Sequence, residues 1–105
     1  ILIQRFQPSF FVEDAVEIPP TSDISLEQRL AIKKQTLDRL FDEPIESINY
    51  NDGLKICFSN NDWVLCRPSG TEPLVRIYAE SASHDQAQNY TNQLKTLLSD
   101  PSALE

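Results

Sequence analysis

Apolar residues recur along this chain with two different spacings, one typical of helices and one typical of strands. Between Ser25 and Phe41 they fall three or four positions apart, which places them close to one face of a helix. Ser25 and Gln28 have the spacing of a capping box, and Glu43-Pro44 interrupts the pattern. The segment is therefore predicted to be an amphipathic helix.

The C-terminal segment shows the same helical spacing. Ser83 and Gln86 form a second pair with capping-box spacing, and Asp100-Pro101 marks the end. The apolar residues between them share one helical face: Ala87, Tyr90, Leu94 and Leu97. A second amphipathic helix is predicted here.

Polar and apolar residues alternate in the segment between the two helices, as in half-buried strands. Four strands are expected, at residues 45–51, 54–59, 63–67 and 74–80. Turn residues separate the first three of them, at Asp52-Gly53 and at 60–62. Because the connections are short, we expect an antiparallel meander with both helices on one face. The predicted fold class is α+β, a four-stranded antiparallel sheet with element order α-β-β-β-β-α.

The first twenty residues fit neither spacing. Apolar residues cluster in them, but Pro19-Pro20 excludes one continuous helix. We expect residues 1–20 to be a frayed short helix and an extended arm, serving as a linker from a preceding domain. The compact domain is then expected over 21–103, and Leu104-Glu105 resembles a cloning scar.

The charge of the chain narrows the choice of partners. Acidic residues outnumber basic ones by 16 to 9, and the net charge of −7 argues against binding to nucleic acid. No apolar run approaches the length of a membrane span and no secretion signal is visible, so a cytoplasmic protein without membrane contact is expected. Cys57 and Cys66 are expected to be free, partly buried thiols, and a zinc site would lack ligands.

The loop between the third and fourth strands has the residues of a small anion receptor, Arg67-Pro68-Ser69-Gly70-Thr71-Glu72-Pro73. Arg67 offers a planar fork of donors for two phosphate oxygens, and Ser69 and Thr71 each add a hydroxyl. Gly70 allows the backbone to approach a ligand closely. Arg76, in the next strand, can supply a second cation. The same composition is common in plain turns between strands, which leaves a purely structural role open.

This seven-residue segment resembles the signature of the last domain of the α-D-phosphohexomutases, the phosphoglucomutase/phosphomannomutase family. Its surroundings are similar too, because Asp52-Gly53 opens a strand, 63–65 leads into the loop, 75–80 leads out of it, and an amphipathic helix follows. The resemblance covers nearly the whole chain. It implies the fold of the phosphoglucomutase C-terminal domain, which is TBP-like.

The resemblance also implies a function. Enzymes of this family have four domains and interconvert hexose 1-phosphates and 6-phosphates through a bisphosphorylated sugar. The first three domains carry a phosphoserine, a Mg²⁺ loop and a sugar-recognition loop, and the last domain holds the phosphate that is not reacting. Carried over by position, Arg67, Ser69, Gly70 and Thr71 would bind the phosphate of a phosphosugar, with Arg76 as a further candidate.

The same resemblance implies that this domain depends on the rest of its enzyme. Its partners would be the phosphosugar, with glucose and mannose phosphates as the first candidates, and the other domains of the same chain. Mg²⁺ is expected in the full-length enzyme, whereas no catalytic residue, metal or other cofactor is expected within this domain. The domain alone would therefore be inactive.

Two alternatives stay open. A phosphoglucosamine mutase shares the Ser-Gly-Thr-Glu-Pro core of the loop, although the strand with Trp63 before the loop favours the glucose/mannose branch. The other alternative is a stand-alone module that binds anions or proteins. Ser69 lacks an adjacent base and is not expected to be a nucleophile. His84 is expected to be an exposed helix residue and Trp63 a core residue.

Overall fold

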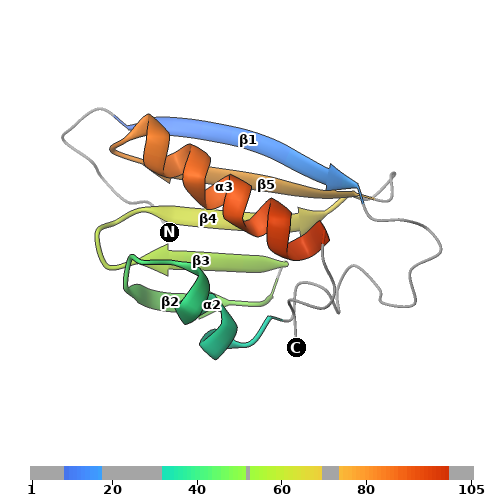
Figure 1. Ribbon diagram of the computed structural model, residues 1–105, viewed down its shortest axis with the longest axis horizontal. Helices are drawn as coiled ribbons and strands as arrows, with labels where there is room; N and C mark the ends of the chain where they lie inside the picture. The colour runs from blue at the N-terminus through green and yellow to red at the C-terminus, as the bar shows by residue number, and fades with distance from the viewer. Residues whose placement is uncertain (1–8, 18–31, 52, 70–73, 100–105) are drawn as a thin grey trace.

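The computed structural model describes residues 9–17, 32–51, 53–69 and 74–99. Within these ranges lie one five-stranded antiparallel sheet and two helices, an α+β arrangement (Figure 1). The elements in chain order are β1 Phe10–Glu17, α2 Lys34–Leu40, β2 Ile45–Asn49, β3 Leu54–Phe58, β4 Trp63–Pro68, β5 Leu74–Ser81 and α3 His84–Ser99. The strands lie side by side in the order β1-β5-β4-β3-β2.

Strand β1 corrects the sequence-based prediction. The arm expected in the first twenty residues is a full strand that pairs antiparallel with β5, from Phe10 opposite Ser81 to Glu17 opposite Leu74. The sheet therefore has five strands rather than four, and a strand precedes the first helix. The segment shows only weak alternation because few of its residues are buried, Val12 and Val16 among them.

The remaining strands form the expected antiparallel meander, with β2 on β3, β3 on β4, and β4 on β5. Of the first predicted helix, Lys34–Leu40 is confirmed, and residues 25–31 lie outside the described ranges. The hydroxyl of Tyr50 donates to the carbonyl of Ile32 at 2.6 Å, which ties the end of β2 to the segment before α2.

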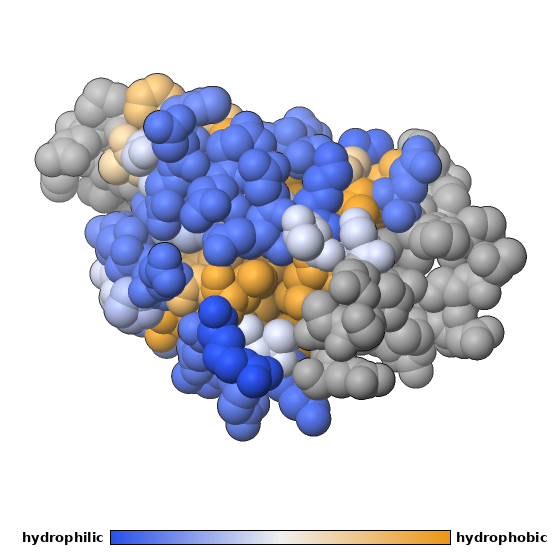
Figure 2. Space-filling view, viewed as in Figure 1, coloured by the Kyte–Doolittle hydropathy of each residue, from blue (hydrophilic) through white to orange (hydrophobic). Residues whose placement is uncertain are grey.

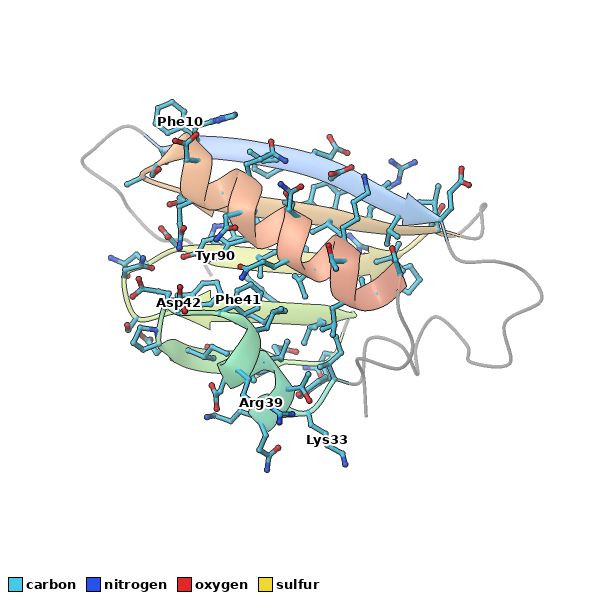
Figure 3. All side chains as sticks on the ribbon, viewed as in Figure 1. Phe10, Lys33, Arg39, Phe41, Asp42 and Tyr90 are labelled. Atoms are coloured by element: carbon cyan, nitrogen blue, oxygen red, sulfur yellow. The ribbon has the colours of Figure 1, made fainter. Side chains whose placement is uncertain are left out.

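Both helices cover the same face of the sheet, α3 packing on β1 and β5 and α2 lying over β2 and β3 (Figure 1). Phe58 in β3 stacks on Tyr90 of α3, with ring centroids 4.5 Å apart, and Phe41 after α2 packs edge-on against both rings. Figure 3 shows Phe41 and Tyr90 in the space between the two helices, whereas Lys33 and Arg39 point outward. These three rings therefore join both helices to the sheet.

The core lies between the helices and this face of the sheet. Its strand residues alternate as the sequence predicts, with Leu54, Ile56 and Phe58 of β3 almost fully buried. The outer surfaces of the helices are polar, and an apolar band lies between them (Figure 2). The opposite face, called here the open face, carries the other residue of each alternating pair, and neither described helix covers it.

Helix α3 begins at the predicted cap. The backbone N–H of Gln86 donates to the Ser83 hydroxyl at 3.3 Å. The reciprocal bond of a capping box is replaced, because the Ser83 N–H donates to the Ser81 hydroxyl at 3.2 Å. Within the described part of the chain, no helix is both long and apolar enough to cross a membrane.

Candidate functional site

Two arginines face each other across β4 and β5, next to the loop with the family signature. Arg67 is paired in register with Arg76, so both side chains lie on the open face. Arg67 is exposed and Arg76 is half-buried. Two guanidinium groups at neighbouring positions offer several N–H donors to one anion, so the pair is suited to phosphate.

Ser69 holds the start of the loop. Its backbone N–H donates to the Leu74 carbonyl at 2.9 Å, which continues the β4–β5 register one step beyond Pro68 and Val75. The Ser69 N–H is committed to this bond, so a contribution of Ser69 to anion binding would come from its hydroxyl rather than from its N–H. Gly70 and Thr71, the other predicted phosphate contacts, and Glu72 lie outside the described residues.

Gly53 supports the same end of the sheet, and its role goes beyond the turn predicted from the sequence. Its φ is +98°, and a Cβ at this position would lie 2.2 Å from the carbonyl oxygen of Cys66 and 3.3 Å from the Cα of Arg67. Only a residue without a side chain allows β3 to begin so close to the backbone that carries Arg67. The sequence marks Gly53 as a turn residue, but this close approach depends on the pairing of two strands.

A pocket of about 320 Å³ adjoins Arg67 on the open face. Its described lining is Asn49, Asn51, Lys55, Leu65 and Arg67. Asn49, Lys55 and Leu65 form one row across β2, β3 and β4, in which each is paired with the next. Sequence analysis did not single out Asn49, Asn51 or Lys55, because only the strand register brings them beside Arg67.

Trp63 corrects a second expectation, since it is half-buried on the open face rather than in the helix-covered core. Its indole N–H donates to Glu80 at 2.9 Å. The Lys55 ammonium lies 5.4 Å from the centre of a Trp63 ring, in cation–π geometry. Phe11 of β1 packs nearby, 6.2 Å from the Trp63 ring, so the strand missed by the sequence completes this cluster.

The two cysteines are free, as predicted, and lie on opposite faces of the β3–β4 hairpin. Cys66 is fully buried, and this burial raises the pKa of its thiol to about 12. It therefore stays protonated at neutral pH and is a poor nucleophile, although it directly precedes Arg67. His84 is exposed, as expected, and its ring meets Phe10 edge-on at 6.0 Å.

The opposite end of β4 holds a buried polar cluster that the sequence did not indicate. Asp62 is 3% exposed, and its Oδ2 accepts hydrogen bonds from the hydroxyls of Ser81 and Tyr90 at 2.9 and 2.8 Å. The side-chain amide of Asn60 donates to the same oxygen at 3.0 Å. Burial, followed by the bond to Asp62, raises the pKa of Tyr90. These three hydrogen-bond partners of Asp62 are side chains of this domain, so the cluster has a structural role.

The described residues do not fit a Mg²⁺ site. Mg²⁺ is usually held by one or two carboxylates together with substrate phosphates and water. Among the residues that the structure describes, no three of the types His, Cys, Asp or Glu are grouped closely enough to hold a metal ion.

Comparisons with known proteins identify the family of this chain. A family model described as the C-terminal domain of phosphoglucomutase/phosphomannomutase matches residues 20–97. The phosphoglucosamine/phosphogalactosamine mutase of Sulfurisphaera tokodaii is 32% identical over 97 residues, which is 92% of this chain and 20% of that protein. The probable phosphoglucosamine mutase of Methanobrevibacter smithii is 38% identical over 81 residues, 70% of this chain and 18% of that protein.

A shorter match is to a relative with a different name. The phosphoglucomutase/phosphomannomutase of Thermococcus kodakarensis is 49% identical over 43 residues, 41% of this chain and 9% of that protein. The chain thus spans a fifth or less of the length of these relatives. The family model covers most of the chain, including β4, β5 and the Arg67–Arg76 pair. The chain therefore belongs to the phosphoglucomutase/phosphomannomutase family, as its C-terminal domain.

Proposed function

We propose that this domain binds the phosphate group of a hexose phosphate that is not reacting, within a longer phosphohexomutase. The observation that carries the proposal is the cross-strand pair of Arg67 and Arg76 at the mouth of the loop. The pair concentrates positive charge at one spot of a chain whose net charge is −7. Ser69, Gly70 and Thr71 are the further proposed contacts, through hydroxyl and backbone groups.

This role uses binding energy at a distance from the chemistry. In phosphoryl transfer the protein contributes mainly by positioning the reactants and by electrostatic stabilisation. Energy gained from gripping the distant phosphate can orient the other end of the sugar. The domain needs no nucleophile for that purpose, so the longer enzyme would be active and this chain alone inactive. The enzyme's phosphoserine, Mg²⁺ site and main sugar-recognition loop would lie in its other domains, and we expect it in the cytoplasm.

Two sugar classes compete as substrates. The position of Trp63 before the loop favoured glucose and mannose phosphates. The names of the relatives that match most of the chain support an amino-sugar phosphate instead. Because Trp63 bonds to Glu80 at the end of the strand away from Arg67, its presence carries little weight for sugar choice. We therefore favour a phosphoglucosamine mutase, with phosphoglucomutase/phosphomannomutase as the second candidate.

The test is an NMR titration of the labelled 105-residue chain with inorganic phosphate. We expect shifts at Arg67, Ser69 and Arg76 with a millimolar dissociation constant, about −4 kcal/mol, because one small anion makes few contacts. Arg67→Ala should remove most of this binding, since each charge-assisted hydrogen bond contributes about 1.5–3 kcal/mol.

Arg39→Ala is the matched control. Arg39 is an exposed arginine of α2 that points outward on the helix-covered side (Figure 3). This variant should bind phosphate as the parent chain does. If Arg67→Ala and Arg39→Ala weakened binding equally, the anion would be responding to overall charge, and the proposed site would be wrong.

A further inference from the structure

The residues that line the pocket beside Arg67 suit a polar organic group better than a second anion. Asn49 and Asn51 contribute carboxamides, Leu65 an apolar surface, and Lys55 the stem of a side chain whose ammonium lies over Trp63. Carboxamides both donate and accept hydrogen bonds, as hydroxyl-bearing ligands require. Its volume of about 320 Å³ is at the small end of the range for ligand pockets.

The donors in this pocket are oriented by the fold. The Asn49 side-chain oxygen accepts the backbone N–H of Asn51 at 2.8 Å, which leaves the Asn49 amide hydrogens available to donate. The neighbouring Tyr50 points the other way and is held by its bond to Ile32. Both asparagines are exposed, so a ligand can reach them from solvent.

The pocket and the arginine pair are contiguous. Arg67 belongs to both, and Leu65 lies two residues before it on the same face of β4, about 6.6 Å away. A molecule whose phosphate is held by Arg67 can extend its next atoms over Leu65, toward Asn49 and the stem of Lys55. Among the described lining residues none is acidic, so nothing in them repels an anionic ligand.

We infer that this pocket receives the hydroxyl-bearing ring of the phosphosugar whose phosphate lies at Arg67. The inference rests on the proposed function and assigns sugar contacts to Asn49 and Asn51, while Lys55 lines the pocket with its stem. The Asn49 amide donates to a ring hydroxyl, and Leu65 packs against the ring's apolar C–H surface.

The experiment compares three ligands on the labelled chain by NMR: inorganic phosphate, glucosamine 1-phosphate and unphosphorylated glucosamine. Phosphate should shift Arg67, Ser69 and Arg76 only. Glucosamine 1-phosphate should shift these and also the side-chain amides of Asn49 and Asn51, and should bind about three- to tenfold more tightly, the gain from one added hydrogen bond. Glucosamine alone should cause no saturable shift.

The outcomes separate the two proposals. If glucosamine 1-phosphate and phosphate gave the same map and the same affinity, the sugar pocket would be wrong while the phosphate site stood. If phosphate caused no shift at Arg67, both proposals would fall. The same titration with glucose 1-phosphate should also reach the asparagines, because the pocket is inferred to recognise hydroxyls.

Two variants test the pocket without touching the arginines. Asn49→Ala should remove the three- to tenfold advantage of the sugar phosphate and leave phosphate affinity unchanged. Leu65→Phe should do the same by filling the pocket. The control is Asn89→Ala, at an exposed asparagine of α3 on the other side of the molecule. If Asn49→Ala and Leu65→Phe both kept the advantage, the inference would be wrong.

Discussion

Strand β4 has a charged residue next to each end, and the two residues differ in burial and in their neighbours. Before its first residue, Asp62 is 3% exposed and its carboxylate is surrounded by neutral donors of the same domain. Near its last residue, Arg67 is exposed, and another arginine lies opposite it. A buried polar group with its partners supplied by the fold serves stability. An exposed arginine beside a second arginine offers several N–H donors and is suited to binding an anion.

This contrast predicts that changes at the Asp62 end affect folding alone, and that changes at the Arg67 end affect binding. The predictions below run from the largest expected effect to the smallest. The three mutational predictions use unfolding by urea, followed by the fluorescence of Trp63, the single tryptophan of the chain.

Gly53→Ala should lower both the free energy of unfolding and the affinity for phosphate, unlike a change at either end of β4 alone. A side chain here must adopt a positive φ, which costs about 1–3 kcal/mol, and it collides with the Cys66 carbonyl, which adds a similar amount. We expect the free energy of unfolding to fall by about 4 kcal/mol and phosphate affinity to fall with it. Asn61→Gly is the control, at a position with φ +74° that already accommodates a side chain, and should change stability by less than about 1 kcal/mol.

Asp62→Ala should lower the free energy of unfolding by about 3 kcal/mol, because the donors of Ser81, Tyr90 and Asn60 lose their common acceptor in a buried site. Phosphate affinity should stay that of the parent chain, which an NMR titration checks. Asp38→Ala, at an exposed aspartate paired with Lys34, should cost about 0.5 kcal/mol or less. A loss of phosphate binding in folded Asp62→Ala would show that the two ends are coupled.

Tyr90→Phe should cost about 1 kcal/mol at neutral pH, since it removes one hydrogen bond and keeps the stacked ring. It should also change how the free energy of unfolding depends on pH in the alkaline range. The pKa of Tyr90 is raised in the folded state, so its contribution is complete below pH 10 and is lost as the pH rises from there. The free energy of unfolding should therefore fall less steeply above pH 10 in Tyr90→Phe than in the parent chain. Equal slopes would contradict a buried, neutral Tyr90.

The last prediction needs no mutation and compares how fast the two thiols are alkylated. At pH 8 an alkylating reagent should modify half-buried Cys57 first, and Cys66 only through opening of the sheet, as peptide mass spectrometry would show. With a pKa of about 12 instead of 9.0, native Cys66 has about a thousandfold less thiolate than an exposed cysteine. Phosphate at ten times its dissociation constant should slow the modification of Cys66 about tenfold, because it binds the native state only. Equal reactivity of the two thiols would mean that Cys66 is accessible in the native state.

Much of the fold could be predicted from local patterns, and the failures share one cause. The alternation in β3 and β5 and the spacing in α3 are strong because one face of each element is buried. β1 has no such regular pattern, and it becomes a strand because β5 offers an edge to pair with and α3 packs over it. Trp63 was misplaced for a related reason, since an aromatic residue in a strand does not reveal which face it occupies.

By itself the sequence determined the fold class and most of the elements, and it singled out the segment Arg67–Pro73 as the proposed phosphate site, because periodicity and a short motif are local properties. Only the tertiary structure decided that Arg76 stands opposite Arg67, that Gly53 must lack a side chain, and that Asn49 and Lys55 line a pocket beside Arg67. These facts depend on strand register. Register joins residues that are distant in the chain, and a slip of one position would turn each of them to the other face.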